Sequence, residues 1–209
     1  MGPGYSREED LYLMRSIHES CGAAIAEATG GNREWNALLA GIAANESRGC
    51  RSAFRFVPAL YQELVALLNG SGPKVDGVTR PQLEKFLGAA GSEAERAALL
   101  KKLAGLHGYT HIPGYNAILW KAPLEALTER EGHFGLAVRL LERLSRDHQL
   151  DPAKDAAEIG RRWNGGRCCG RTQAAMYGWR LGERMRLYRE IEGASSLSVS
   201  RRTADSSID

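Results

Sequence analysis

The sequence has no long apolar run, and it is poor in cysteine and aromatic residues. No stretch of its 209 residues approaches the roughly 18 uninterrupted apolar residues of a membrane-spanning helix, so we expect no membrane span. The first residues do not combine a basic start with an apolar segment, so we expect no secretory signal in this chain. Length and composition predict one globular domain over residues 1–192, with enough apolar residues for a substantial core.

The 4 cysteines are too few for a disulfide framework in a chain of this length. They form no C-x-x-C pair and have no histidine at zinc-finger spacing, so we expect no metal site and no cofactor. Cys168 and Cys169 are adjacent in a glycine-rich segment, where only Arg167 and Arg171 would favour a thiolate. Two reduced thiols without a role and a functional thiol pair are both open interpretations.

The charge is nearly balanced, with a formal net charge of +3. This small excess permits attraction to a polyanion but does not identify one. The basic surplus is concentrated between residues 161 and 189 and at Arg201–Arg202. It leaves open a helical nucleic-acid-binding protein, whose phosphate contacts would make binding steeply salt-dependent.

Helical periodicity dominates the chain, and three helix starts carry a capping box, at Ser6 with Glu9, Thr79 with Gln82, and Ser92 with Glu95. Residues 70–77 have turn chemistry and predict either a short irregular hairpin or a loop. We therefore predict a mainly α fold with a small irregular or short β insert between helices. Residues 193–209 are serine-rich and carry few apolar side chains, which predicts a disordered tail.

Residues 35–49 place a carboxylate, Glu46, on the apolar stripe of a predicted helix. The stripe follows helical spacing through Trp35, Leu38, Leu39 and Ile42. An ionised carboxylate in an apolar setting costs free energy unless it is paired, so such a group is able to hold a proton near neutral pH. A general acid needs that property. The alternative is a partly exposed end residue or the partner of a nearby arginine, with Arg48, Arg51 and Arg55 as candidates.

Two later segments accompany Glu46-Ser47: the loop Gly108-Tyr109-Thr110-His111-Ile112 and the turn Trp163-Asn164-Gly165-Gly166. In this order the three resemble motifs of the lysozyme-like superfamily, in the branch of soluble lytic transglycosylases, goose-type lysozymes and phage-type muramidases. There a Glu-Ser pair ends a buried helix, a Gly-x-x-Gln-Ile/Met loop follows, and a Tyr-Asn-x-Gly turn comes later. Residues 53–58 and 184–188 are also similar to phage-type members.

The resemblance implies a lysozyme-like helical domain and a bacteriolytic glycosidase. Such an enzyme cleaves the β-1,4 bond of peptidoglycan between N-acetylmuramic acid and N-acetylglucosamine, with Glu46 as acid and then base. A single-acid lytic transglycosylase gives a 1,6-anhydro product, whereas a hydrolysing muramidase needs a placed water, with Asp76 as a possible helper. The implied substrate-binding residues are Ser47, Tyr109, Thr110, His111, Tyr115, Trp163 and Asn164. Tyr109 and Tyr115 either stack on sugars or pack their loop onto the core, and Asn164 either binds an N-acetyl group or stabilises the turn.

The sequence departs from these motifs at three positions. His111 replaces the usual Gln, Pro113 the usual Met, and Trp163 the Tyr whose hydroxyl orients the acid in the family. An indole donates a hydrogen bond but does not accept one at its nitrogen, so we expect another group to orient Glu46. The candidates are Thr110, Tyr109 and Tyr177.

These departures also leave open a weak or inactive cell-wall-binding protein of the same fold. In either case we expect a monomer that binds glycan strands and not nucleic acid. We expect synthesis in the cytoplasm and action at the bacterial wall after phage lysis or dedicated export, or action outside the cytoplasm if a leader has been removed.

Overall fold

The computed structural model describes residues 6–164 and 171–205, and these residues are mainly helical. They form α-helices α1 to α9, a short 3-10 helix η1, and strands β1 to β3. This confirms the predicted mainly α class with a small β element. The chain divides into two compact units, unit 1 (Met1–Gly49 with Phe134–Asp209) and unit 2 (Cys50–His133). The boundary falls inside α7 (Arg130–His148), and one domain over residues 1–192 stays a prediction.

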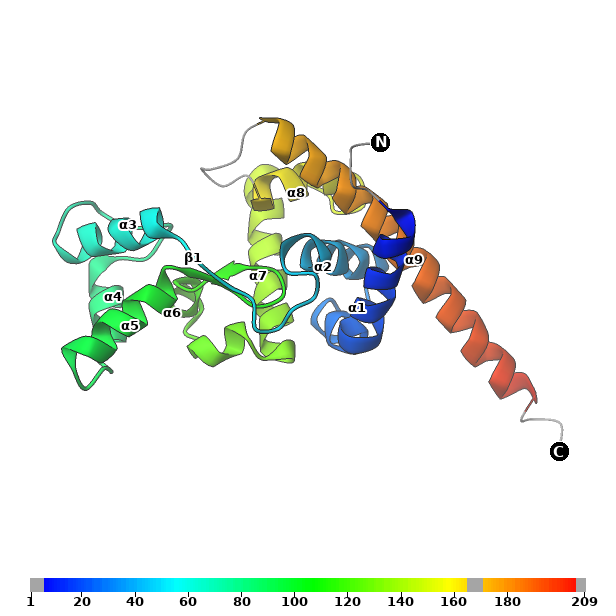
Figure 1. Cartoon of the computed structure of the whole chain (residues 1–209), viewed down its shortest axis with the longest axis horizontal. Helices are drawn as coiled ribbons and strands as arrows, with labels where there is room; N and C mark the ends of the chain where they lie inside the picture. The colour runs from blue at the N-terminus through cyan, green and yellow to red at the C-terminus, as the bar shows by residue number, and fades with distance from the viewer. Residues whose placement is uncertain (1–5, 165–170, 206–209) are drawn as a thin grey trace. The chain divides into compact units, whose positions relative to one another are not determined.

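Unit 1 is built around the long helix α9 (Arg171–Asp205), which packs against α1 (Arg7–Ala28), α2 (Arg33–Glu46) and α8 (Ala156–Asn164) (Figure 1). Ser6 and Asn32 cap the first two helices by accepting hydrogen bonds from backbone N–H groups of the first turn. Apolar side chains from these helices and from α7 form the core, including Met14, Ile17, Ile25, Leu38, Leu39, Ile42, Phe134, Leu141, Ile159, Leu181 and Tyr188. Burial of these stripes against one another holds the helices together.

Three glycines allow α9 to lie unusually close to its neighbours in unit 1. A Cβ on Gly41 of α2 would lie 2.6 Å from Leu181 Cδ1, and one on Gly160 of α8 would lie 2.5 Å from Leu181 Cδ2. A Cβ on Gly178 of α9 would lie 2.8 Å from the carbonyl oxygen of Ala157. The absent side chains therefore bring α2 and α8 into contact with the same face of α9.

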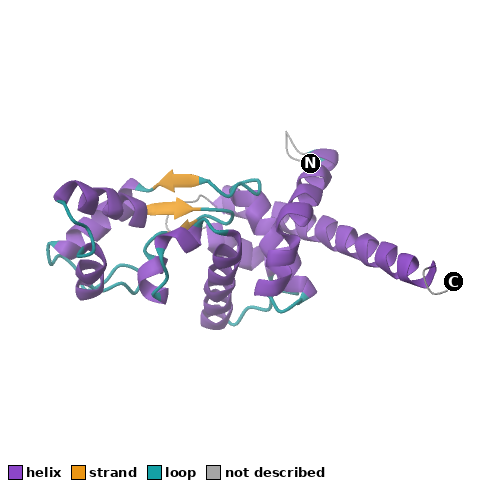
Figure 2. Ribbon diagram, turned by 90° about the horizontal axis from the view of Figure 1, so that it is seen from below, coloured by secondary structure: helices purple, strands orange, loops and turns teal. Residues whose placement is uncertain are grey.

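Unit 2 contains a small antiparallel sheet in the order β1-β2-β3, formed by β1 (Phe54–Phe56), β2 (Gly105–His107) and β3 (Ile112–Pro113) (Figure 2). Its other elements are α3 (Pro58–Leu68), α4 (Arg80–Leu87), α5 (Glu93–Leu103), α6 (Asn116–Trp120) and η1 (Leu124–Leu127). Its buried cluster comprises Leu60, Leu64, Leu67, Val75, Val78, Leu83, Leu87, Leu100, Leu103, Ala104, Tyr115 and Ile118. One face of each short helix supplies this core.

The predicted short hairpin or loop at residues 70–77 is distinct from the three-stranded sheet, which is built from other segments. Residues 70–77 form a turn region with a single bridge between Val75 and Val78. The segment 106–116, which lacks a sequence period and was expected to be a loop, instead supplies the end of β2, a tight turn, β3 and the start of α6. Its strands are too short for a period of two to be recognisable.

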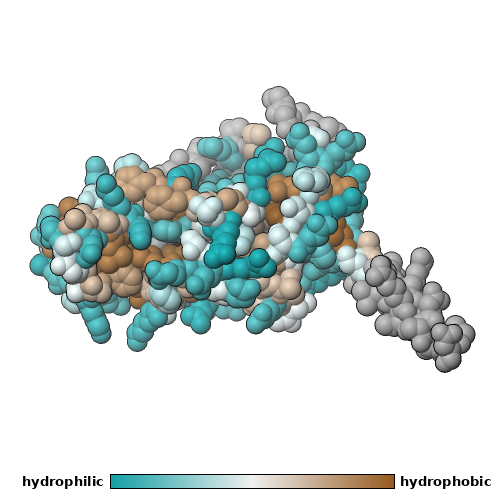
Figure 3. Space-filling model, turned by 60° about the horizontal axis from the view of Figure 1, so that its bottom comes forward, coloured by the Kyte–Doolittle hydropathy of each residue, from teal (hydrophilic) through white to brown (hydrophobic). Residues whose placement is uncertain are grey.

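The last helix continues beyond the point where composition favours disorder. α9 runs to Asp205 and so includes the first part of the segment 193–209, while the final four residues lie outside the described part of the chain. None of the helices in the described ranges combines the length and apolar character needed to cross a bilayer. The surface in view in Figure 3 is largely hydrophilic, with smaller apolar patches between the polar side chains.

Candidate functional site

Glu46 is the last residue of α2, and its side chain is half-buried. Leu38, Leu39 and Ile42 of the predicted stripe are fully buried in unit 1, whereas Trp35 is half-buried. Every residue from Asn36 to Ala44 is buried, so α2 is enclosed on all sides and not on one stripe alone. The helix ends here because Arg48 and Gly49 take left-handed conformations, with φ 56° and 77°. The backbone N–H of Gly49 then donates to the carbonyl of Ala43 at 3.2 Å, and the Ser47 hydroxyl donates to the same carbonyl at 3.3 Å. The carboxylate thus projects from the end of a rigid, buried helix.

Tyr177 of α9 binds this carboxylate directly. Its hydroxyl donates to Glu46 Oε1 at 2.8 Å. Desolvation of the phenol, together with the neighbouring Glu46 carboxylate, raises the pKa of Tyr177 well above its usual range. The phenol therefore stays protonated and acts as a donor. Tyr177 is one of the three candidates that the sequence offered for orienting Glu46. It lies on α9, the helix that follows α8 and Trp163 in the chain.

A buried ion pair lies in the same hydrogen-bond network. Arg184 of α9 donates through Nε and Nη2 to Asp10 Oδ1 of α1, at 3.1 and 2.6 Å. Its Nη1 donates to Asn45 Oδ1 at 2.7 Å, and the amide of Asn45 donates to the backbone carbonyl of Tyr177 at 3.3 Å. Both charged side chains are almost fully enclosed, with 5% and 9% of their surfaces exposed. Sequence reasoning missed this pair, although Asp10 shares the helical stripe of Met14 and Ile17.

His133 organises a second polar cluster, which lies in unit 2. Its Nδ1 is 2.8 Å from the carbonyl of Leu127, and its Nε2 accepts from the backbone N–H of Thr110 at 2.9 Å. These contacts fix a neutral imidazole that carries its proton on Nδ1. Burial lowers the pKa of His133 to about 4, against the raising effect of its bond to Leu127. A Cβ on Gly108, at φ +66°, would lie 2.3 Å from the Leu127 oxygen, so only glycine fits this turn.

The predicted sugar-binding residues of the 108–116 segment belong mostly to the interior of unit 2. Thr110 is fully buried against His133, and the Tyr109 ring packs edge-on against the same imidazole. Tyr115 is buried in the unit 2 core and donates its hydroxyl to Asp76 Oδ2 at 2.9 Å. These positions match the packing interpretation of the two tyrosines and do not support the predicted sugar contact of Thr110. His111 is half-buried, in a left-handed conformation with φ 55°.

The other predicted residues lie in unit 1. Trp163 and Asn164 are the last two residues of α8, and both are half-buried. The glycines that follow them, and the pair Cys168-Cys169, lie outside the described residues. In the ranges 6–164 and 171–205, no group of three or more His, Cys, Asp or Glu side chains is arranged to hold a metal ion.

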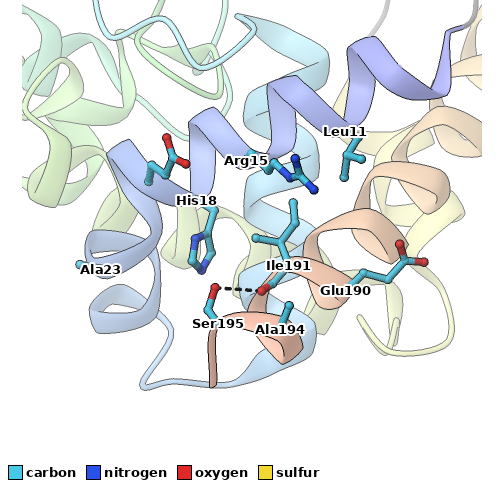
Figure 4. A pocket seen from close by; sticks show the side chains of 9 residues that line it. Leu11, Arg15, His18, Ala23, Glu190, Ile191, Ala194 and Ser195 are labelled. Carbon is cyan, nitrogen blue, oxygen red and sulfur yellow. Dashed lines mark hydrogen bonds between the residues drawn. The ribbon is translucent and has the colours of Figure 1, made fainter. Parts of the chain in front are cut away.

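A groove of about 700 Å³ lies between α1 and α9 (Figure 4). Leu11, Arg15 and His18 line one side, and Glu190, Ile191 and Ser195 line the other. At 1.5 Å per residue, Glu190 lies about 20 Å along α9 from Tyr177. This part of the groove is therefore distant from the hydrogen bond between Tyr177 and Glu46.

Comparison of the chain with protein-family models, with characterised proteins and with solved structures returned no match. The function of this chain is therefore inferred from the chemistry of its side chains. Unit 1 brings together Glu46, Asn45, Tyr177, Arg184 and Asp10, whereas Tyr109, Thr110, His111 and Tyr115 belong to unit 2. The first group holds a half-buried carboxylate against a protonated phenol, an arrangement suited to acid–base chemistry.

Proposed function

We propose that this chain is a peptidoglycan-cleaving glycosidase that acts on the β-1,4 bond between N-acetylmuramic acid and N-acetylglucosamine. Glu46 is its acid and base. The observation that carries the proposal is the 2.8 Å hydrogen bond from the Tyr177 hydroxyl to Glu46 Oε1 at the end of α2. It supplies the orienting hydroxyl that the resemblance to lytic transglycosylases requires and that Trp163 lacks.

The proposed reaction begins with proton transfer from Glu46. While Tyr177 holds Oε1, the neutral Glu46 carboxyl gives its proton to the glycosidic oxygen. The bond between the anomeric carbon of N-acetylmuramic acid and that oxygen breaks, leaving an oxocarbenium-like centre and a free hydroxyl on N-acetylglucosamine. The Glu46 carboxylate then takes a proton from the incoming nucleophile.

A lytic transglycosylase step fits a site with one available carboxylate. The nucleophile is then the 6-hydroxyl of the same N-acetylmuramic acid: its oxygen attacks the anomeric carbon, and its proton goes to Glu46. The other carboxylate of the unit 1 network, that of Asp10, is engaged by Arg184. A helper role for Asp76 in hydrolysis stays a prediction.

The ion pairs of unit 1 give little support to the nucleic-acid alternative. Arg161 and Arg162 both pair with Glu158, whose pKa they lower to about 2. Arg186 and Arg189 also pair with carboxylates. These arginines are partly neutralised within the protein, which weakens the counterion-releasing contacts that phosphate binding needs.

Digestion of purified sacculi tests the proposal. The full chain is expected to release soluble muropeptides, and the Glu46→Gln variant, which lacks the transferable proton, is expected to release none. Glu142→Gln is the matched control, because Glu142 is an exposed carboxylate on α7. Mass spectrometry of the products separates the chemistries, since the anhydro product is lighter by one water. Equal release by the wild type and Glu46→Gln would exclude Glu46 as the acid.

Removing the Tyr177 hydroxyl tests the orienting contact. A hydrogen bond to a charged group contributes about 1.5–3 kcal/mol, so kcat of Tyr177→Phe should fall about 10- to 100-fold while KM changes little. Tyr188→Phe is the control, because it removes a hydroxyl from another buried position of the same helix. A Tyr177→Phe variant with wild-type kcat would contradict the assigned role.

A further inference from the structure

The buried Asp10–Arg184 pair joins α1 to α9 at a high cost in desolvation free energy. Desolvating both charges costs several kcal/mol, and apolar residues of similar volume often stabilise a fold as well or better. The geometry is also poor for stability, because both donors converge on Asp10 Oδ1. Asp10 Oδ2 is buried without a hydrogen-bond partner. Holding α1 to α9 therefore does not account for the pair.

The third contact of Arg184 leads to the proposed acid. Its Nη1 holds the side-chain carbonyl of Asn45, the residue directly before Glu46. The same Asn45 side chain donates to the backbone of Tyr177. Tyr177 and Arg184 are seven residues apart, or two helical turns, and so share one face of α9. Asn45 thus links the end of α2 to α9 at two points, and one of them is the backbone of Tyr177, the residue that binds Glu46.

We propose that Asp10 and Arg184 are positioning residues for the acid, acting through Asn45 on the end of α2. Asp10 orients the guanidinium, the guanidinium fixes the Asn45 carbonyl, and the Asn45 amide fixes the Tyr177 backbone. These contacts fix the backbone on both sides, so the Glu46 carboxylate and the Tyr177 hydroxyl are held at hydrogen-bond distance. This inference rests on the proposed glycosidase activity, and it extends the machinery to a residue of the first helix.

Two variants separate positioning from simple stabilisation. The double variant Asp10→Leu/Arg184→Met replaces the ion pair by apolar side chains and leaves no unpaired charge. Asn45→Ala keeps the ion pair and removes only the link. Arg186→Met is the matched control, because Arg186 lies on the same helix with 41% of its side chain exposed.

We expect the double variant and Asn45→Ala to melt within a few degrees of the wild type while kcat on sacculi falls at least tenfold and KM stays within about twofold. A shift of the reacting groups of about 1 Å is enough for such a loss. Arg186→Met should retain wild-type kcat. If both variants fold and keep wild-type kcat, the positioning role is overturned. If the double variant does not fold, Asn45→Ala decides alone.

A second readout does not depend on activity. In the wild type, the ¹³Cζ resonance of Tyr177 should shift when Glu46 is replaced by Gln, because the carboxyl acceptor of the phenol becomes an amide. In the double variant and in Asn45→Ala, the same replacement should shift it by less than half as much. An equal shift in every background would overturn the positioning role. A wild type that leaves sacculi intact would instead defeat the proposed function, whatever the resonance shows.

Discussion

The two units enclose titratable side chains in opposite ways. Unit 1 buries an ion pair, with Arg184 held between Asp10 and Asn45. Unit 2 keeps His133 neutral, because one ring nitrogen donates to a carbonyl while the other accepts from an amide. Burying charged groups costs several kcal/mol of desolvation free energy, whereas a neutral imidazole with both nitrogens hydrogen-bonded links two backbone segments without that cost. Under the proposed function, the polar interior of unit 1 serves chemistry, whereas that of unit 2 fixes the shape of a turn.

Breaking the charged network should have the largest effect. In Arg184→Met the Asp10 carboxylate stays buried without a counter-charge, and the free energy of unfolding at pH 7 should fall by about 3–5 kcal/mol. Urea denaturation measures the loss, and hydrogen exchange of the α1 and α9 amides shows whether it is confined to unit 1. A loss below about 1 kcal/mol would mean that water reaches and solvates Asp10.

Acid should weaken the neutral cluster in the next largest step. The pKa of His133 is about 4 in the folded protein and 6.5 when unfolded, so between these values the unfolded chain binds more protons. The His133 contribution is complete above about pH 6.5 and is lost as the pH falls towards 4, by up to about 3 kcal/mol. His107, whose pKa burial also lowers, acts in the same direction.

Residue-resolved NMR titration checks this prediction. The His133 imidazole should remain neutral well below pH 6, and the hairpin amides of residues 108–111 should lose exchange protection as the pH approaches 4. Glu158, whose pKa falls from 4.5 to about 2 on folding, loses its stabilising contribution between these values, so it overlaps this window only at its acidic end. A His133 that titrates near 6.5 in the folded protein would contradict the assigned tautomer and hydrogen bonds.

The smallest effect is expected where charge is exposed on the same helix as Arg184. Arg186 pairs with Glu183 at 2.9 Å and also with Glu190, and its side chain is 41% exposed. Solvent screens such pairs, so Arg186→Met should change the free energy of unfolding by less than about 1 kcal/mol. The Arg184→Met and Arg186→Met variants carry the same substitution at a buried and an exposed site. The difference between their free energies of unfolding in urea therefore measures the effect of burial. Equal losses would remove the distinction between the two arginines.

Much of this fold could be predicted from local patterns. The stripe from Leu38 to Glu46 identified α2, and the capping boxes at Ser6 and Thr79 marked helix starts that the structure confirms. These features depend on residues three or four apart, which the sequence displays directly. The sheet was not predicted in place, because Phe54 pairs with His107 across more than fifty residues, and local periodicity carries no information about such pairing.

The candidate site was predicted only in part for the same reason. Glu46 and Tyr177 were identified as an acid and a possible partner, but their 131-residue separation hid their contact. Asp10 carries the signal that revealed Glu46, an acid on an apolar stripe, and Arg184 shares a stripe with Leu181 and Tyr188. Two opposite charges on apolar faces of different helices are a reason to expect a buried pair.

Leu181 gives α9 a fixed register. Its two methyl groups occupy the spaces left by Gly41 on one side and Gly160 on the other. Sliding α9 by one turn, about 5.4 Å, would bring Tyr177 or Met185 to this position, and neither has the branched shape that fills both spaces at once. Packing of Leu181 against both glycines therefore favours a single register of α9. Leu181 is four residues from Tyr177, about one helical turn, so the register of α9 sets the position of the phenol along the helix axis. The Asn45 contact with the Tyr177 backbone then fixes it beside Glu46.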